Sequence, residues 1–98
     1  MKPERTSAFY IANLGSEVFR LQSGLAKGDA GLAEGALRRA RAIFEKLLEM
    51  PLRNAARSEI KILQEVIEDL PTEKPHFAVD VQSLQDYFLP FARLVLKN

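Results

Sequence analysis

Four segments of this sequence carry apolar residues spaced three and four positions apart. In the first segment, roughly Pro3 to Lys27, these residues are Ile11, Leu14, Val18, Leu21 and Leu25. An α-helix completes a turn in about 3.6 residues, so this spacing gathers the side chains into one apolar stripe. The period-two alternation that is typical of strands never lasts more than a few residues. The pattern therefore predicts an all-α protein.

Residues that begin and end helices stand at the joints between the first three segments. Gly28 can adopt the left-handed conformation that closes a helix, and Asp29 can accept hydrogen bonds from the first amides of a second helix, roughly Ala30 to Met50. Pro51 ends this second helix, and Asn54 is a possible cap for the third. The first two predicted helices are thus joined by a very short turn.

The last joint is the longest one. Pro71 ends the third helix, and the loop PTEKPHFAVD leads to Asp80, which we expect to cap a fourth helix. Four amphipathic helices with mostly short turns pack most simply as an up-down-up-down four-helix bundle. A chain of 98 residues forms one domain at most, so we assign the bundle to residues 1–98.

The inner face of the second helix is built from small residues in its N-terminal half. Its stripe consists of Ala33, Ala36, Ala40, Ile43 and Leu47, flanked by Leu37 and Phe44. Alanines allow a neighbouring helix to approach closely. We expect Phe9 or Phe19 of the first helix to fill the space opposite the alanines.

The charges are balanced, with 14 Lys plus Arg and 13 Asp plus Glu, so no strong overall field attracts nucleic acid or a membrane surface. The absence of cysteine suits a reducing compartment and favours the cytoplasm. Pro3 and Glu4 stand where an export signal would be basic. No run of about 18 apolar residues occurs, so we expect no membrane span.

Basic residues of the second helix have acidic neighbours. Glu34 precedes Arg38 by four positions and Glu45 follows Arg41 by four, a spacing that favours ion pairs on a solvated helix face. In the third helix, basic residues fill the first half and carboxylates the second half. This order opposes the helix dipole and costs a few tenths of a kcal/mol for each exposed group.

Two interpretations account for that unfavourable order. In an antiparallel pair of helices, Arg53 and Arg57 can pair with Glu45 and Glu49 at the end of the second helix, and we favour this structural interpretation. The other interpretation is a polyanion site. Its residues would be Arg39, Arg53, Arg57 and Lys61.

No catalytic, cofactor-binding or metal-binding motif occurs in the sequence. His76 is the only histidine and stands between Pro75 and Phe77 in the long loop, a setting typical of a surface residue. The Glu-x-x-His motif of dimetal bundles is absent, as are serine-nucleophile motifs, glycine-rich phosphate loops and zinc spacings. We therefore predict that the protein is not an enzyme and has no cofactor.

The stretch ALRRARAIFEKLLEMP resembles one helix of a tetratricopeptide repeat. Such repeats recur at about 34 residues. Here Asp29 and Asp80, which begin alternate helices, are 51 residues apart, and the tryptophan-leucine-glycine part of the repeat is missing. A single bundle is the better interpretation.

Two stretches, YIANLGSEVFR near the start and YFLPFA near the end, resemble those of a family of small uncharacterised bacterial helical proteins. That resemblance implies no activity. A helical bundle is also the architecture of the HEPN family of RNases and their inactive relatives. The HEPN signature pairs an arginine with a histidine a few residues later, whereas Arg57 precedes His76 by 19 positions, so the RNase activity would not carry over.

The C-terminal stretch DYFLPFARLVLKN is more apolar than a bundle helix requires. Val81, Leu84, Phe88, Phe91 and Val95 form its inner face. Pro90 lacks an amide proton, so we expect a bend there. Further apolar residues widen the arc on both sides and are candidates for an interface with a second copy or a partner helix. They are Tyr87, Leu89, Leu94 and Leu96.

These observations predict a non-catalytic helical interaction module that forms a homodimer through its C-terminal helix. The alternative is a small nucleic-acid-binding accessory protein, a HEPN-like bundle without the RNase motif, which would use the basic stripe on the second and third helices.

Overall fold

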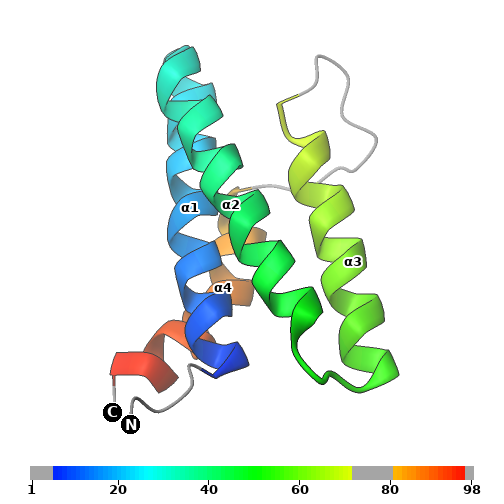
Figure 1. Ribbon diagram of the computed structural model, residues 1–98. Coiled ribbons are helices and arrows are strands. Elements are labelled where there is room, and N and C mark those ends of the chain that lie inside the picture. The colour runs from blue at the N-terminus through cyan, green and yellow to red at the C-terminus, as the bar shows by residue number, and fades with distance from the viewer. Residues whose placement is uncertain (1–5, 72–80, 97–98) are drawn as a thin grey trace, which may run out of the picture.

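The computed structural model describes the backbone of residues 6–71 and 81–96 and the side chains of residues 6–71 and 82–90. Within these residues the structure has four helices and no strand, which confirms the prediction of an all-α protein. The helices are α1 (Ser7–Lys27), α2 (Ala30–Glu49), α3 (Asn54–Asp69) and α4 (Val81–Leu96) (Figure 1).

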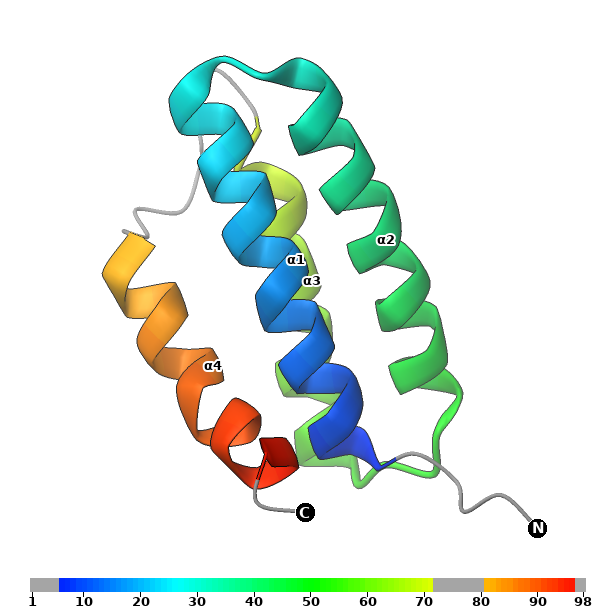
Figure 2. The same cartoon turned by 90° about the vertical axis from the view of Figure 1, so that its left-hand side faces the viewer.

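Helix α1 is the central element of the packing. It contacts α2 along one side and α4 along another, whereas α3 packs mainly against α2 (Figures 1 and 2). Successive helices run in alternate directions in the ribbon, from α1 upward to α4 downward (Figure 1). These contacts are consistent with the predicted bundle.

The turn between α1 and α2 has the predicted caps. Gly28 has a φ of 70°, a left-handed conformation that ends α1. Oδ1 of Asp29 accepts a hydrogen bond from the amide of Leu32 at 3.0 Å. Helix α1 begins later than predicted, because Thr6 is extended and its hydroxyl oxygen accepts a hydrogen bond from the amide of Phe9 at 3.2 Å.

The start of α3 differs from the prediction. Asn54 is not its cap but its first helical residue, because the extended residue before the helix is Arg53. No side chain caps this end by a hydrogen bond. The predicted cap of α4, Asp80, lies outside the described residues.

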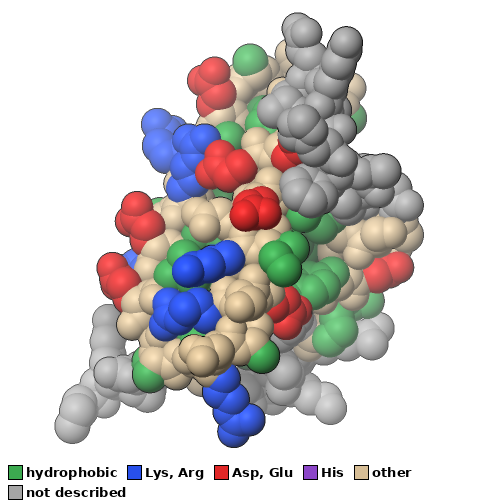
Figure 3. Space-filling view, turned by 90° about the vertical axis from the view of Figure 1, so that its right-hand side faces the viewer, with side chains coloured by type: hydrophobic (Ala, Val, Ile, Leu, Met, Phe, Trp, Pro, Cys, Tyr) green, Lys and Arg blue, Asp and Glu red, His purple; other side chains and the backbone are tan. Residues whose placement is uncertain are grey.

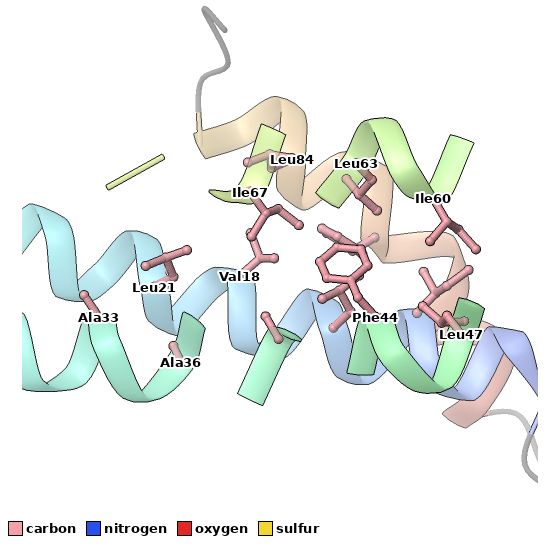
Figure 4. Packing of buried hydrophobic residues seen from close by; sticks show 14 residues of the cluster. Val18, Leu21, Ala33, Ala36, Phe44, Leu47, Ile60, Leu63, Ile67 and Leu84 are labelled. Atoms are coloured by element: carbon pink, nitrogen blue, oxygen red, sulfur yellow. The ribbon is translucent and has the colours of Figure 1, made fainter. Parts of the chain in front are cut away.

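Apolar residues from all four helices form one core, and Figure 4 shows its packing. The buried residues are Ile11, Leu14, Val18, Leu21, Ala33, Ala36, Ala40, Phe44, Leu47, Ile60, Leu63, Ile67, Leu84 and Phe88. The predicted alanine face of α2 is therefore buried. Burial of such a set is the main source of stability in a domain of this size.

Three details of the predicted core are wrong. Phe19 does not fill the space opposite the alanines, because it lies one position beyond the stripe of α1 and is 54% exposed. Phe9 does not fill it either, since it lies near Ile43 and Lys46 in the C-terminal half of α2. The buried aromatic residue of α2 is Phe44, whereas Ile43 is only partly buried. Leu25 is exposed at the end of α1, where the stripe extends past the core.

Helix α4 contains Pro90 in its interior and continues to Leu96. Its ribbon changes direction in the last turns, next to the C-terminus (Figure 2). A proline removes one hydrogen bond of the helix and clashes with the preceding turn, which accounts for the bend.

Candidate interaction surfaces

The predicted interface residues of α4 lie on two different edges of the helix. Tyr87 is partly buried on the edge that faces α3, where its hydroxyl donates a hydrogen bond to Oε1 of Glu59 at 2.7 Å. Leu89 is 46% exposed on the edge that faces α1. The structure therefore does not bring Tyr87 and Leu89 together. Leu94 and Leu96 belong to the last turns of α4, whose side chains lie outside the described residues.

Helices α1 and α4 meet at a glycine. A Cβ atom added to Gly15 would lie 2.7 Å from Cβ of Phe88, so the aromatic side chain packs directly on the backbone of α1. Beside this contact is a shallow groove of about 190 Å³, which we call the α1/α4 groove. It is lined by Ala12, Gly15, Ser16, Gln85, Phe88 and Leu89.

Phe19 stands next to the α1/α4 groove. It follows Gly15 by four positions and Ser16 by three, so it occupies the neighbouring turn on the same face of α1. This face carries no charged residue. Its members are Ala8, Ala12, Ser16, Phe19, Ser23 and Ala26. Of the charged residues of α1, Glu17 and Arg20 form ion pairs on another side of the helix, and Lys27 lies at its last turn, four positions after Ser23.

A second groove, of about 250 Å³, separates α3 from α4. We call it the α3/α4 groove, and its lining is Glu59, Ile62, Leu63, Val66, Ser83, Leu84 and Tyr87. The backbones of α3 and α4 do not pack closely along their length, unlike those of α1 and α4. The hydrogen bond between Tyr87 and Glu59 links the two helices at this groove.

The environment of Tyr87 keeps its hydroxyl protonated. Burial raises the pKa of the phenol, and the hydrogen bond to the Glu59 carboxylate raises it further. The ring of Tyr87 also packs edge to face against Phe88, with 5.2 Å between the centroids. Tyr87 is thus a fixed hydrogen-bond donor on the α3 edge of α4.

A third groove, of about 380 Å³, lies between α1 and α2 and contains an ion-pair cluster. Nε of Arg39 donates to Oε1 of Glu17 at 2.9 Å, and Nη1 of Arg20 donates to Oε2 of the same carboxylate at 3.0 Å. Glu17 is nearly buried, so these two cations compensate its charge. Arg39 of the predicted polyanion site therefore already has a carboxylate partner.

Arg57 offsets the unfavourable charge order of α3 in a way that the sequence did not predict. Its guanidinium donates to the carbonyl oxygens of Leu48 and Met50, at 2.7 and 3.0 Å, at the end of α2. Cations are favoured at the C-terminus of a helix. The predicted ion pairs of Arg53 and Arg57 with the glutamates of α2 do not form, because Arg57 reaches the carbonyl groups instead.

Helices α2 and α3 are also joined by an ion pair between Arg41 and Glu68. Nε and Nη2 of Arg41 donate to the two carboxylate oxygens, both at 2.7 Å. This hydrogen bonding lowers the pKa of Glu68, although partial burial opposes the shift. The predicted partner of Arg41 was Glu45 of the same helix, and the structure corrects that prediction.

Of the four residues of the predicted polyanion site, two remain on the surface with no ion pair in the described part of the chain. These are Arg53 and Lys61, both exposed. Basic side chains gather over the N-terminal half of α3, and acidic ones lie above and beside them (Figure 3). Arg39 and Arg57 have the partners given above.

Sequence reasoning missed two exposed apolar residues. Phe19 follows Val18 of the α1 stripe, and Ile62 precedes Leu63 of the α3 stripe. A large apolar side chain one position off a core stripe turns about 100° out of the core. The position of Phe19 and Ile62 next to a core stripe could therefore have predicted that they are exposed.

No group of three His, Cys, Asp or Glu side chains in the described residues is arranged to hold a metal ion. His76 lies outside these residues. None of the described helices has the length and apolar character that crossing a bilayer requires.

Comparisons of the chain with protein-family models, with curated proteins and with solved structures each found no match. The geometry of the surfaces is therefore the basis of the functional argument.

Proposed function

We propose that this protein is a non-catalytic, up-down-up-down four-helix bundle that pairs with a second copy of itself through the face formed by α1 and α4. The proposal rests on one observation: Leu89, which is 46% exposed, lines the α1/α4 groove, and Phe19, which is 54% exposed, lies one turn of α1 beyond the groove residues Gly15 and Ser16. The cytoplasm is the proposed compartment, since the sequence has no cysteine.

The size of the α1/α4 groove favours a protein side chain as its occupant. Its volume of about 190 Å³ is below the range of about 300–1,000 Å³ that is usual for small-molecule sites. In a two-fold dimer the same patch is used by both partners. Phe19 of each copy would then enter the groove of the other copy, and Leu89 would cover it.

The charge pattern favours a second copy over an unlike partner. A homodimer places each face against itself, so charges near its axis would repel one another. The α1 face from Ala8 to Ala26 has no charged side chain, and the net charge of the chain is only +1. A standard interface buries about 800 Å² on each partner, roughly a ninth of the 7002 Å² surface of this chain.

In this proposal the predicted interface residues do not all belong to the dimer face. Leu89 belongs to the dimer face, whereas the side chains of Leu94 and Leu96 lie outside the described residues. Tyr87 belongs to the bundle instead, because it is partly buried and hydrogen-bonded to Glu59.

Light scattering behind a sizing column tests the dimer. We expect the wild-type protein to have twice the mass of one chain, and Phe19→Glu and Leu89→Glu to be monomeric. Burying one such side chain contributes about 1.5–3 kcal/mol, and the substitution is present in both copies, so each variant should weaken dimerisation by roughly 100- to 10,000-fold. Ile62→Glu is the matched control, because it places the same charge on an exposed apolar site of α3. A monomeric wild type at all concentrations contradicts the proposal.

The nucleic-acid alternative has less support. Arg39 and Arg57 use donors within the chain, which leaves Arg53 and Lys61 as the exposed cations of that site. Fluorescence anisotropy with mixed RNA and duplex DNA at about 50 mM salt tests it, because electrostatic binding is strongest at low salt. Binding that Arg53→Gln with Lys61→Gln abolishes would favour the alternative.

A further inference from the structure

The α3/α4 groove is a second surface, separate from the proposed dimer face. Its α3 wall is formed by Ile62, Leu63 and Val66, and its α4 wall by Leu84 and Tyr87. Ile62 is 58% exposed, the highest value among the large exposed hydrophobic residues of the described chain. An apolar side chain this exposed, next to further apolar lining, leaves a continuous apolar strip in contact with water.

The length of the groove matches a short stretch of helix. From Glu59 to Val66 the α3 wall covers eight residues, which is about 10 Å at the rise of an α-helix. Two helical turns fit this length. A helix that lies in such a groove contributes apolar side chains at i, i+4 and i+7.

The rim of the groove is acidic. Glu59 is part of the lining, Glu65 follows Ile62 by three positions, and Asp86 follows Ser83 by three. Among the described residues, no Lys or Arg is part of the lining. Figure 3 shows hydrophobic side chains beside α3 with acidic side chains next to them.

We infer that the α3/α4 groove binds an amphipathic helix of a partner protein, one whose apolar face is flanked by lysine or arginine. The apolar walls supply the contact area, and the rim carboxylates attract the basic flanks and set the orientation. An anionic membrane or a nucleic acid would be repelled by the same rim. A second copy of this chain is the competing occupant, and the self-association of Ile62→Glu and Phe19→Glu below distinguishes it from a partner helix.

The open spacing of α3 and α4 supports the inference. Phe88 packs on the backbone of α1 at Gly15, so the α1/α4 contact has no room for an added helix. At α3/α4 the backbones are farther apart, and side chains join the two helices, among them the hydrogen bond between Tyr87 and Glu59. The groove can therefore accept a partner without separation of tightly packed backbones.

A synthetic peptide tests this inference on the full-length protein. The probe is a fluorescent helix of about 14 residues, with leucines at i, i+4 and i+7 and lysines on both sides of them. We expect saturable binding in an anisotropy titration, with Ile62→Glu weakening the affinity about tenfold or more. A peptide with glutamates in place of the lysines should bind far more weakly, as should a scrambled peptide of the same composition.

Two charge variants of α3 distinguish attraction by the rim carboxylates from the general electrostatic attraction between peptide and protein. Glu65→Gln removes a rim carboxylate and should weaken binding about two- to threefold, whereas Lys61→Gln changes a charge of α3 away from the groove and should not weaken it. Raising the salt from about 50 to 500 mM should also weaken binding. Circular dichroism confirms that each variant keeps its helices.

Three results would overturn the inference. Equal binding of the lysine and glutamate peptides would mean that the rim has no role. Unchanged binding to Ile62→Glu would place the peptide elsewhere on the molecule. Loss of self-association in Ile62→Glu but not in Phe19→Glu would show that the groove holds a second copy, and the inference would then fail together with the proposed dimer face.

Discussion

Helices α1 and α3 are attached to the rest of the molecule by different means. Helix α1 is held by close backbone packing at two glycines: Gly15 lies under Phe88 of α4, and a Cβ atom at Gly24 would lie 2.8 Å from the backbone nitrogen of Ala33 in α2. It also contributes four residues to the core. Apart from the Arg39–Glu17 ion pair with α2, these contacts are apolar or involve the backbone, so they change little with pH or salt.

Helix α3 depends more on polar side chains. It contributes Ile60, Leu63 and Ile67 to the core, but its edges are held by hydrogen bonds. Arg41 and Arg57 connect α3 with α2, and the Tyr87–Glu59 hydrogen bond connects it with α4. Polar links at a surface are individually weak and depend on protonation state.

The difference indicates which part of the fold can adapt. Regions with few close contacts open locally at a lower free energy than the core. We therefore expect α3 to be the less protected helix in hydrogen exchange and α1 the more protected one. The α1/α4 side would then be a fixed surface for a symmetric dimer, while the α3/α4 side would adjust to a partner helix. The predictions below test this contrast.

The largest expected effect comes from adding one methyl group at the α1/α4 contact. In Gly15→Ala the new Cβ would clash with Phe88, so α4 must move. We expect the free energy of unfolding to fall by about 1–3 kcal/mol, as in overpacked cores. Gly31→Ala is the matched control: it adds the same group in α2, where the nearest atom is Asp29 Oδ1 at 3.6 Å, and should stabilise by roughly 0.5–1 kcal/mol.

Urea denaturation of both variants makes the measurement. If Gly15→Ala is as stable as Gly31→Ala, the close packing of α1 on α4 is not what holds these helices.

A smaller effect on stability is expected at α3 when the pH is lowered. The pKa of Glu68 is lowered in the folded state by hydrogen bonds from Arg41, so the unfolded chain binds this proton more readily. The stabilisation by the pair is therefore present above the unfolded pKa of about 4.3 and is lost as the pH falls through the folded value. Wild type should lose more stability than Glu68→Gln between neutral pH and about pH 3.

Hydrogen exchange followed by residue locates this loss. Amides of α3 should lose protection in acid before those of α1, and Glu68→Gln should show the faster α3 exchange already at neutral pH. Equal loss of protection in α1 and α3 would contradict the contrast between the two helices.

Much of the helical framework could be predicted from the sequence, because stripes and caps are local signals. The caps at Gly28 and Asp29 depend on backbone preferences within one turn, and both are confirmed. The cap of α3 was predicted one position too late, at Asn54. Helix ends vary by a residue or two because neighbouring positions compete for the same extended conformation.

The surfaces were harder to predict, because they depend on how each helix is rotated against its neighbours. The pair of Arg41 with Glu68 joins residues 27 positions apart, whereas the sequence offered Glu45 within the same helix. The same rotation turns Tyr87 toward α3 and Leu89 toward the α1 edge, although both belong to one apolar arc. Helical period gives the width of an arc, but only the packing shows which part of it stays exposed.

The smallest expected effect comes from removing the hydroxyl that spans the α3/α4 groove. Tyr87→Phe keeps the ring on Phe88 and deletes only the hydrogen bond to Glu59. We expect a loss of about 0.5–1.5 kcal/mol at neutral pH, with faster exchange in α3. Peptide binding should persist, since the walls of the groove stay apolar.

The stability of Tyr87→Phe at alkaline pH is a second test of the same hydrogen bond. The pKa of Tyr87 is raised in the folded state by burial and then by the Glu59 carboxylate, so the folded chain holds this proton more tightly than the unfolded chain. The resulting stabilisation is complete below the unfolded pKa of about 10 and is lost as the pH rises through the folded value. Wild type should therefore lose stability more steeply above about pH 10 than Tyr87→Phe. Parallel curves would mean that the hydroxyl does not hold α3 to α4, and the polar attachment of α3 would then rest on Arg41 and Arg57.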